Sequence, residues 1–334
     1  MKHGGDPPFD DPDHADRWLD LSTGINPLAY PLPELNSADW QNLPSARNKE
    51  ALLAAARAYY NVPDDVAVGA VPGTEAAINL LPGILTGPAG IAEPTYSSHR
   101  AAWSARGHEV YAHSHGAAAA ARQHLIVVNP NNPTGEFRSA ETLLKLAEAL
   151  APDCVLIVDE AFMDCTPQSS IVPQIRPDTP IIVLKSFGKF FGLAGLRLGF
   201  AIGRRDLVEA LSDRFGDWSI SGPALRIGKV ALADREWQAA SRMHLKHSMD
   251  RLEALLKGPD RIIGRTDLFL LYRHGHAVRL HRYLAEQRIW TRIFSAKPTW
   301  LRFGAPCSIA DFSRLARTIE EFEKLQRETC SDAS

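Results

Sequence analysis

The sequence contains few cysteines and no long apolar segment. Its four cysteines, Cys154, Cys165, Cys307 and Cys330, are scattered without C-x-x-C spacing, which favours reduced thiols over a disulfide framework or a zinc site. No run of about eighteen apolar residues is present, so we expect no membrane-spanning helix. The polar first residues lack the apolar stretch of a signal peptide, and we therefore expect a cytoplasmic protein.

An excess of one charge is also lacking. The formal net charge is −2 over 334 residues, without blocks of like charge. The sequence therefore lacks the charge excess that is typical of proteins that bind nucleic acids or membrane surfaces. The dinucleotide motif G-x-G-x-x-G and the hydrolase motif G-x-S-x-G are absent. Three close histidine pairs lack the cysteines or carboxylates that would complete a metal site, so we expect no metal.

Short apolar segments alternate with helical spacing over the first two thirds of the chain. Residues 66–71, 124–129, 154–159, 180–185 and 198–203 are apolar almost throughout, as strands covered on both faces tend to be. The segments between several of them have helical periodicity. This alternation predicts a large, mostly parallel sheet between layers of helices.

The pattern changes after Pro223. A long or broken helical stretch, 223–256, precedes short strands at 268–273, 291–294 and 300–304, with helices at 276–287 and 308–328. We therefore predict three parts. They are an N-terminal arm (1–50) associated with the small domain and the active site, a large domain (51–235) and a small α+β domain (236–334).

Reactive and polar residues follow the predicted strands. In an open α/β sheet, ligands bind beyond the carboxyl ends of the strands. The turn Gly73-Thr74-Glu75 follows the first strand and opens a helix, whose free N–H groups favour an anion. Asn132 and Asp159 follow or end the next two.

Two lysines stand where the strand 180–185 ends. Lys185 is the last residue of this segment, and Ser186, Lys189 and Arg197 follow it. Together with the turn Gly73-Thr74-Glu75 and the carboxylate of Asp159, these groups suit pyridoxal phosphate, which needs a lysine for its aldehyde and donors for its phosphate. A carboxylate would keep the ring nitrogen protonated, because a charge pair at about 4 Å and an effective dielectric of about 20 is worth about 4 kcal/mol.

The segments "NPNNPTG", "VDEAF" and "SFGKFFGLAGLRLG" resemble the fold-type I pyridoxal-phosphate enzymes of the histidinol-phosphate aminotransferase branch. The segments "HGGD", "LDLSTGINP" and "WLRFGAP" are similar to the threonine-phosphate decarboxylases of cobalamin biosynthesis. The resemblance implies pyridoxal 5′-phosphate as cofactor, a large mostly parallel α/β/α domain with a smaller α+β domain, a small phosphorylated amino-acid substrate, and a homodimer.

The resemblance also implies a role for each matching residue. Lys189, eight residues before Arg197, is the Schiff-base lysine, and Lys185 is structural or solvated. The cofactor-binding residues implied are Gly73, Thr74, Glu75, Ser186 and Arg197 for the phosphate, Asp159 for the ring nitrogen, Asn132 for the ring hydroxyl and Tyr96 for stacking. The substrate-binding residues implied are Arg302, Arg292, Asn26 and His3.

Two positions depart from the aminotransferase pattern. Phe162 and Leu43 stand where many of these enzymes carry a tyrosine that contacts the ring hydroxyl or the cofactor phosphate.

Three hypotheses about the function follow from the sequence. The first is decarboxylation of L-threonine O-3-phosphate, and the second is transamination, for instance of histidinol phosphate, with almost the same residues. The third, a non-catalytic cofactor-binding regulator, is disfavoured by the intact lysine and by the lack of a DNA-binding segment.

Overall fold

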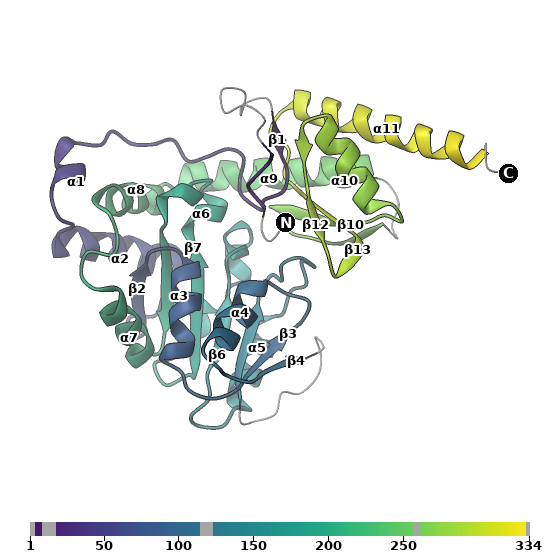
Figure 1. Ribbon diagram of the computed structural model, residues 1–334. Coiled ribbons are helices and arrows are strands. Elements are labelled where there is room, and N and C mark those ends of the chain that lie inside the picture. Colours follow the sequence, from purple (N-terminus) through teal and green to yellow (C-terminus); the bar gives the residue numbers. More distant parts are fainter. Residues whose placement is uncertain (1–3, 9–17, 114–122, 257–260, 332–334) are drawn as a thin grey trace. The chain divides into compact units, whose positions relative to one another are not determined.

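The computed structural model describes residues 4–8, 18–113, 123–256 and 261–331 (Figure 1). The described chain divides into two compact units. The smaller unit contains the residues up to Leu28 together with those from Ala240 onward, and the larger contains Ala29–Ala239. The predicted arm is thus shared, because residues 29–50 cluster with the larger unit.

A seven-stranded sheet forms the centre of the larger unit. Its strand order is β2-β8-β7-β6-β5-β3-β4. Among the described strands of this sheet, β8 runs opposite to all the others, so the prediction of a mostly parallel sheet is confirmed. The strands are β2 (Ala67–Val71), β3 (Ala89–Ala92), β4 (Val110–His113), β5 (His124–Val128), β6 (Leu156–Asp159), β7 (Ile181–Ser186) and β8 (Gly199–Gly203).

Helices begin at sequence signals that stabilise their first turns. The hydroxyls of Ser45, Ser139 and Ser221 accept hydrogen bonds from backbone N–H groups at the starts of three helices, which satisfies donors that would otherwise lack partners. The helices of this unit are α1 (Ser37–Gln41), α2 (Ala46–Tyr60), α3 (Thr74–Leu80), α4 (Ser97–Ala105), α5 (Ala140–Glu148), α6 (Phe187–Phe190), α7 (Arg205–Phe215), α8 (Gly222–Ala233) and the first residues of α9 (Arg235–Leu256).

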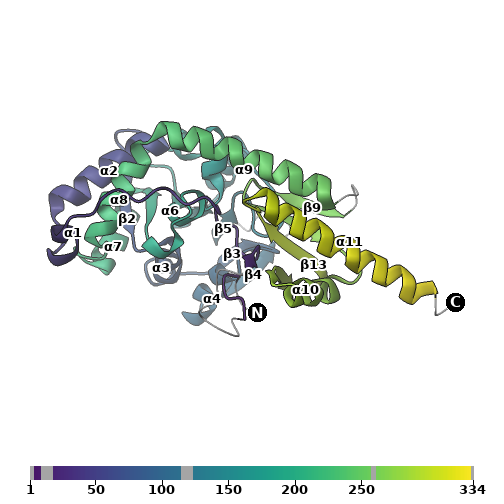
Figure 2. The same ribbon diagram turned by 90° about the horizontal axis from the view of Figure 1, so that it is seen from above.

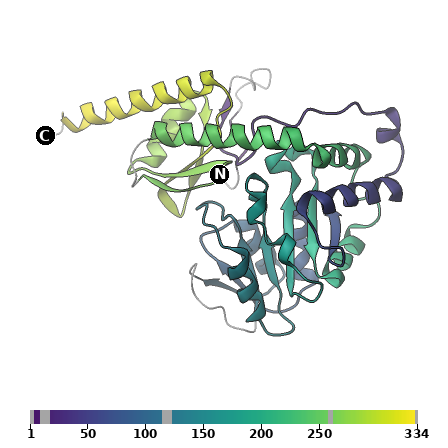
Figure 3. The ribbon, with the colours of Figure 1, turned by 180° about the vertical axis from the view of Figure 1, so that it is seen from behind.

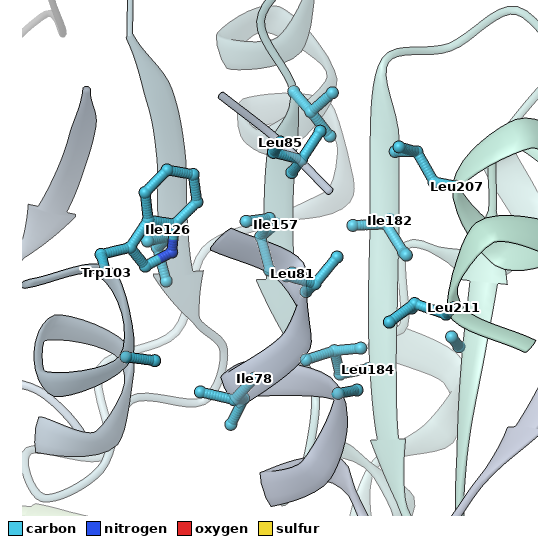
Figure 4. Packing of buried hydrophobic residues seen from close by; sticks show 14 of the residues in the cluster. Ile78, Leu81, Leu85, Trp103, Ile126, Ile157, Ile182, Leu184, Leu207 and Leu211 are labelled. Carbon is cyan, nitrogen blue, oxygen red and sulfur yellow. The ribbon is translucent and has the colours of Figure 1, made fainter. Parts of the chain in front are cut away.

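The core of this unit lies between the sheet and helices α3, α4 and α7 (Figure 4). Ile78, Trp103 and Leu211 from these helices pack with Ile157 and Ile182 of the central strands, and all are at most 2% exposed. Burying a large aliphatic or aromatic side chain stabilises a fold by about 1.5–3 kcal/mol. Helices α2 and α8 cover the opposite face, seen in Figure 3. The strands are therefore apolar on both sides, as the sequence predicted.

The smaller unit contains an antiparallel sheet of order β12-β13-β10-β9 and a parallel pair, β1-β11. Helices α10 and α11 lie beside this sheet (Figure 2). The strand β9 was not predicted from the sequence. The elements are β1 (Leu19–Asp20), β9 (Ile262–Arg265), β10 (Phe269–Arg273), β11 (Ile289–Trp290), β12 (Arg292–Phe294), β13 (Lys297–Gly304), α10 (Ala277–Glu286), α11 (Ile309–Ser331) and the later part of α9.

None of the described helices combines the length and the apolar character that crossing a membrane requires. The longest described helices, α9 and α11, both carry charged residues along their length.

Candidate active site

The strand register brings the ends of four strands into one row. Val71 of β2 and Ser186 of β7 both pair with Gly199, and Val128 of β5 pairs with Asp159 of β6. A cavity of about 150 Å³ lies at this edge of the sheet. It is lined by all nine residues predicted to bind the cofactor, namely Gly73, Thr74, Glu75, Tyr96, Asn132, Asp159, Ser186, Lys189 and Arg197.

Arg197 and the start of α3 meet at one end of this cavity. Arg197 has a left-handed backbone with φ of 54°, a conformation that residues other than glycine rarely adopt, and its Nη1 donates to the carbonyl of Ala194 at 2.9 Å. A Cβ added to Gly73 would lie 2.5 Å from Arg197 Nη2. The guanidinium therefore lies against the glycine turn. With the first N–H groups of α3 and the hydroxyl of Ser186 nearby, these donors suit a phosphate group.

Gly73 is required here for two reasons, and its replacement gives a testable prediction. Its φ is +80° and a Cβ would displace the guanidinium of Arg197, so we expect Gly73→Ala to weaken binding of pyridoxal phosphate to the apoprotein by about 10- to 100-fold, the cost of one lost charge-assisted contact of about 1.5–3 kcal/mol. Titration of cofactor absorbance measures this.

Gly107→Ala is the matched control for Gly73→Ala. Gly107 has a similar φ of +78°, but a Cβ there meets no atom within 4 Å. Gly107→Ala therefore introduces a similar backbone strain but leaves Arg197 in place. Equal affinity losses in the two variants would show that strain, and not Arg197, causes the effect.

The carboxylate of Asp159 is buried and held at both oxygens. Its Oδ1 accepts a hydrogen bond from the backbone N–H of Ala161 at 3.1 Å, and Oδ2 lies 3.0 Å from Nε2 of His99. His99 is itself buried and was not among the predicted residues. Tyr96 directly precedes α4 and His99 lies in the first turn of that helix, so the closeness of the two residues in sequence was the signal that could have found His99.

Tyr96 is hydrogen-bonded to Glu75 across the same cavity. The hydroxyl of Tyr96 donates to Oε2 of Glu75 at 3.0 Å. Burial, followed by smaller effects that include the charge of Glu75, raises the pKa of Tyr96 to about 12. The phenol therefore stays protonated at neutral pH. Tyr96 lines the cavity as a neutral ring, and the side chain of Glu75 anchors it.

Lys189 lies in the single helical turn α6. The turn is anchored by the buried rings of Phe187 and Phe190. The Nζ of Lys189 lies 5.8 Å from the ring centroid of Phe162. Phe162 is buried and lines the cavity without a hydroxyl.

The two lysines that the sequence placed together have different surroundings. Lys189 lines the cavity, whereas Lys185 is only 1% exposed and lies 2.8 Å from Oε2 of Glu160. Of the two roles predicted for Lys185, the solvated one is wrong. The apolar contacts of β7 continue to its last residues, so a lysine at that end is enclosed and needs a buried carboxylate as partner.

The candidate substrate-binding residues belong to the smaller unit. Arg292 of β12 pairs directly with Arg302 of β13, and Nη2 of Arg302 donates to the carbonyl of Ser22 at 2.7 Å. Like charges opposite each other on one sheet are unfavourable, so this pair suits an anion. Asn26 is buried, and its Nδ2 donates to Oγ of Ser241 at 2.8 Å. His3 lies outside the described residues.

The sequence matches the aminotransferase class I and II family over residues 33–319. The chain belongs to this family. It is 41% identical over 323 residues to a threonine-phosphate decarboxylase of Pseudomonas aeruginosa, and 92% of each chain is covered. It is 39% identical over 312 residues to a threonine-phosphate decarboxylase of a Sinorhizobium species, again with 92% of each chain covered.

A solved structure confirms the fold of this class I and II family member. The histidinol-phosphate aminotransferase of Clostridium acetobutylicum superposes with a TM-score of 0.79 at 21% identity, covering 92% of this chain and 99% of that one. Enzymes of this family depend on pyridoxal phosphate. The cavity fits that group, since it combines a buried carboxylate, a lysine and an arginine whose guanidinium lies against the glycine turn, where a Cβ at position 73 would displace it.

Proposed function

We propose that this chain is a pyridoxal-phosphate-dependent decarboxylase that converts L-threonine O-3-phosphate into 1-aminopropan-2-ol O-phosphate and CO2, a reaction of cobalamin biosynthesis. The observation that carries the proposal is the 41% identity over 92% of the chain to a threonine-phosphate decarboxylase. At that similarity and coverage, both units of the chain are matched. The fold similarity to an aminotransferase does not oppose it, because one fold serves several reactions.

The residues lining the cavity would hold the cofactor in distinct ways. Arg197, Ser186 and the N–H groups of Thr74 and Glu75 would bind its phosphate, and Asp159 would hold the proton on the ring nitrogen. Tyr96 would stack on the ring, and Asn132 would bind the ring hydroxyl. When bound, the cofactor supplies an electron sink for the bond broken at the substrate Cα.

The protein would decide which bond breaks by orienting the substrate. Arg302 and Arg292 would bind the substrate phosphate, which leaves the α-carboxylate free of ion pairs and able to leave as CO2. Binding energy from the phosphate is then used to orient the reacting end. Asn26 and His3 are proposed to contact the substrate as well. The amine of Lys189 would hold the cofactor and would deliver a proton to Cα, which replaces the carboxylate lost as CO2.

The decisive experiment mixes the cofactor-loaded protein with L-threonine O-3-phosphate without any keto acid. Release of CO2 and 1-aminopropan-2-ol O-phosphate, with the cofactor spectrum restored, supports the proposal. Conversion of the cofactor to pyridoxamine phosphate without CO2 would identify an aminotransferase instead. Inertness toward this compound and histidinol phosphate would favour a binding protein. L-threonine is the control, and we expect far slower turnover because it lacks the phosphate.

The proposed enzyme acts as a homodimer through an apolar surface on the larger unit. Leu32, Trp40 and Leu43 of the N-terminal arm and Trp218 before α8 are all more than 60% exposed. The arm is held next to α8, since Arg226 Nε lies 3.7 Å from Asp39 Oδ2. Exposed large apolar side chains gathered in this way are typical of an interface, and a second copy of the chain is the partner that the resemblance implies.

Sedimentation equilibrium tests this assembly. We expect Trp40→Ser together with Leu43→Ser to raise the dimer dissociation constant about 30-fold or more, which corresponds to loss of a buried aromatic anchor worth about 2 kcal/mol. Tyr111→Ser on the edge strand β4, 47% exposed in the wild type, is the control and should leave association unchanged. A wild-type protein that is monomeric at high concentration would contradict the proposal.

A further inference from the structure

A buried ionic cluster lies next to the cavity and has no part in the chemistry above. The Nζ of Lys185 is 2.8 Å from Oε2 of Glu160 and 3.5 Å from Oδ1 of Asp164. The three side chains are 1%, 0% and 3% exposed. Burial lowers the pKa of Lys185, but the charges of Glu160 and Asp164 outweigh it and raise the pKa overall. The ammonium is therefore charged.

Stability alone does not explain such a cluster. Removing an ion pair from water costs several kcal/mol per ion, and replacing it by apolar residues of similar volume is often neutral or stabilising. The neighbouring ring of Tyr60, 4.9 Å from Lys185 Nζ, and the buried phenylalanines around β7 would accommodate an apolar side chain. The cluster is better explained by what it holds in place.

Lys185 joins the two ends of the turn that follows β6. Glu160 is the first residue after β6, and Asp164 lies in the short 3-10 helix Met163–Cys165. Two of the three residues between them, Ala161 and Phe162, line the cavity. An ammonium bound to both carboxylates therefore fixes the length and path of this turn.

The same turn determines where Asp159 points. The N–H of Ala161 donates to Oδ1 of Asp159 at 3.1 Å. Glu160 is further held by Ser170, whose hydroxyl donates to Oε2, and by the N–H of Ile171 at 2.9 Å from Oε1. Its own N–H donates to the carbonyl of Leu184 at 2.9 Å. Because successive residues of an extended strand point to opposite sides, Asp159 faces the cavity while Glu160 faces the cluster.

We infer that Lys185 is a positioning residue, whose ion pairs with Glu160 and Asp164 hold the turn 159–164 so that Asp159 and Phe162 are oriented toward the bound cofactor. This inference rests on the proposed function only in assigning the cavity to pyridoxal phosphate. The inference goes beyond the proposed function because it gives a role to Lys185.

The test uses variants that separate positioning from folding. Lys185→Met combined with Glu160→Gln keeps the formal charge of the cluster at −1, since one cation and one anion are both removed. Because Asp164 stays buried without its cation, we expect this double variant to melt below the wild-type temperature. We also expect it to bind pyridoxal phosphate about 10- to 100-fold more weakly, the loss seen when outer partners of ligating groups are removed in metal sites. Lys185→Arg, which can still bridge both carboxylates, should bind the cofactor nearly as well as the wild type.

Two readouts are measured without substrate. They are the dissociation constant of pyridoxal phosphate for each apoprotein and the visible circular dichroism per bound cofactor, which reports its orientation. Wild-type values of both in the double variant would overturn the inference, whatever its melting temperature. If the double variant does not fold, Asp164→Asn decides the matter, because it cuts one of the two ion pairs. A wild-type cofactor affinity in Asp164→Asn would then overturn the inference.

These outcomes are distinct from those of the proposed function. A wild-type protein that binds pyridoxal phosphate but releases no CO2 from L-threonine O-3-phosphate contradicts the decarboxylase and leaves the comparison of the variants intact. A wild-type protein that does not bind pyridoxal phosphate overturns both.

Discussion

Replacing Lys189 with alanine is expected to lower the turnover number by about three to four orders of magnitude. The variant loses the amine that we propose links the cofactor covalently and moves the proton at Cα, and a positioned acid–base group alone contributes about 10²–10⁴-fold. The visible absorbance of the lysine–cofactor linkage should also disappear. Stopped assays of CO2 release and absorbance spectra of the loaded protein measure the two effects.

Lys145→Ala is the control for this prediction. Lys145 is 70% exposed and forms an ion pair with Glu141 one helical turn away on α5, an interaction that contributes little to stability at a surface. This variant should match the wild type in spectrum and turnover. A Lys189→Ala protein that kept more than a tenth of the wild-type rate would show that another residue performs the chemistry, and Lys189 would have to be reassigned.

Replacing Asp159 with asparagine is expected to reduce the turnover number by about three orders of magnitude. Asparagine keeps the volume and can still accept the hydrogen bond from Ala161, but it removes the negative charge that we propose holds the proton on the cofactor ring. A charge pair at about 4 Å and an effective dielectric of about 20 is worth about 4 kcal/mol, which converts to roughly a thousandfold in rate.

His99→Gln separates the charge of Asp159 from its orientation. The glutamine amide can take the position of the imidazole Nε2, which lies 3.0 Å from Oδ2 in the wild type, so we expect a loss of about tenfold or less. Asp159→Asn and His99→Gln should bind the cofactor and melt cooperatively, as followed by absorbance and circular dichroism. If both variants lost activity equally, the buried pair as a unit, and not the charge on Asp159, would carry the effect.

The central strands and the rim residues could be predicted because each carries a strong local signal. Strands β5, β6 and β7 are continuous apolar runs, and the residues that follow them belong to motifs with fixed spacing. Parallel strands place their carboxyl ends at one edge. That is why residues as distant in sequence as Gly73 and Arg197 could be assigned to one place.

Other elements could not be predicted because their stabilisation is tertiary. Strand β3 reads Ala-Gly-Ile-Ala and has little intrinsic β preference. It forms because β4 and β5 pair with it on either side. The antiparallel direction of β8 is likewise set by its pairing with β2 and β7 and not by its composition.

The buried polar partners of Asp159 and Lys185 also could not be predicted from the sequence. His99 and Glu160 were not singled out by a motif, and a glutamate is mostly found at a surface. Their roles follow only once the fold brings His99 next to Asp159 and Glu160 next to Lys185. A pattern of residue types cannot reveal such pairs, because the contact partners are separated by 60 residues for His99–Asp159 and by 25 for Glu160–Lys185.

The division of the chain into two units also bears on the order of folding during synthesis. All of the larger unit, Ala29–Ala239, leaves the ribosome before any of the C-terminal part of the smaller unit. The strand β1 near the N-terminus can pair with β11 only when Ile289 and Trp290 have been made. Since domains generally fold as units in the order in which they emerge, the first residues translated must wait for the last ones. A truncation before Ile289 would therefore leave both the N-terminal strand and Ser22, the partner of Arg302, without their native contacts, while the larger unit could still form its sheet.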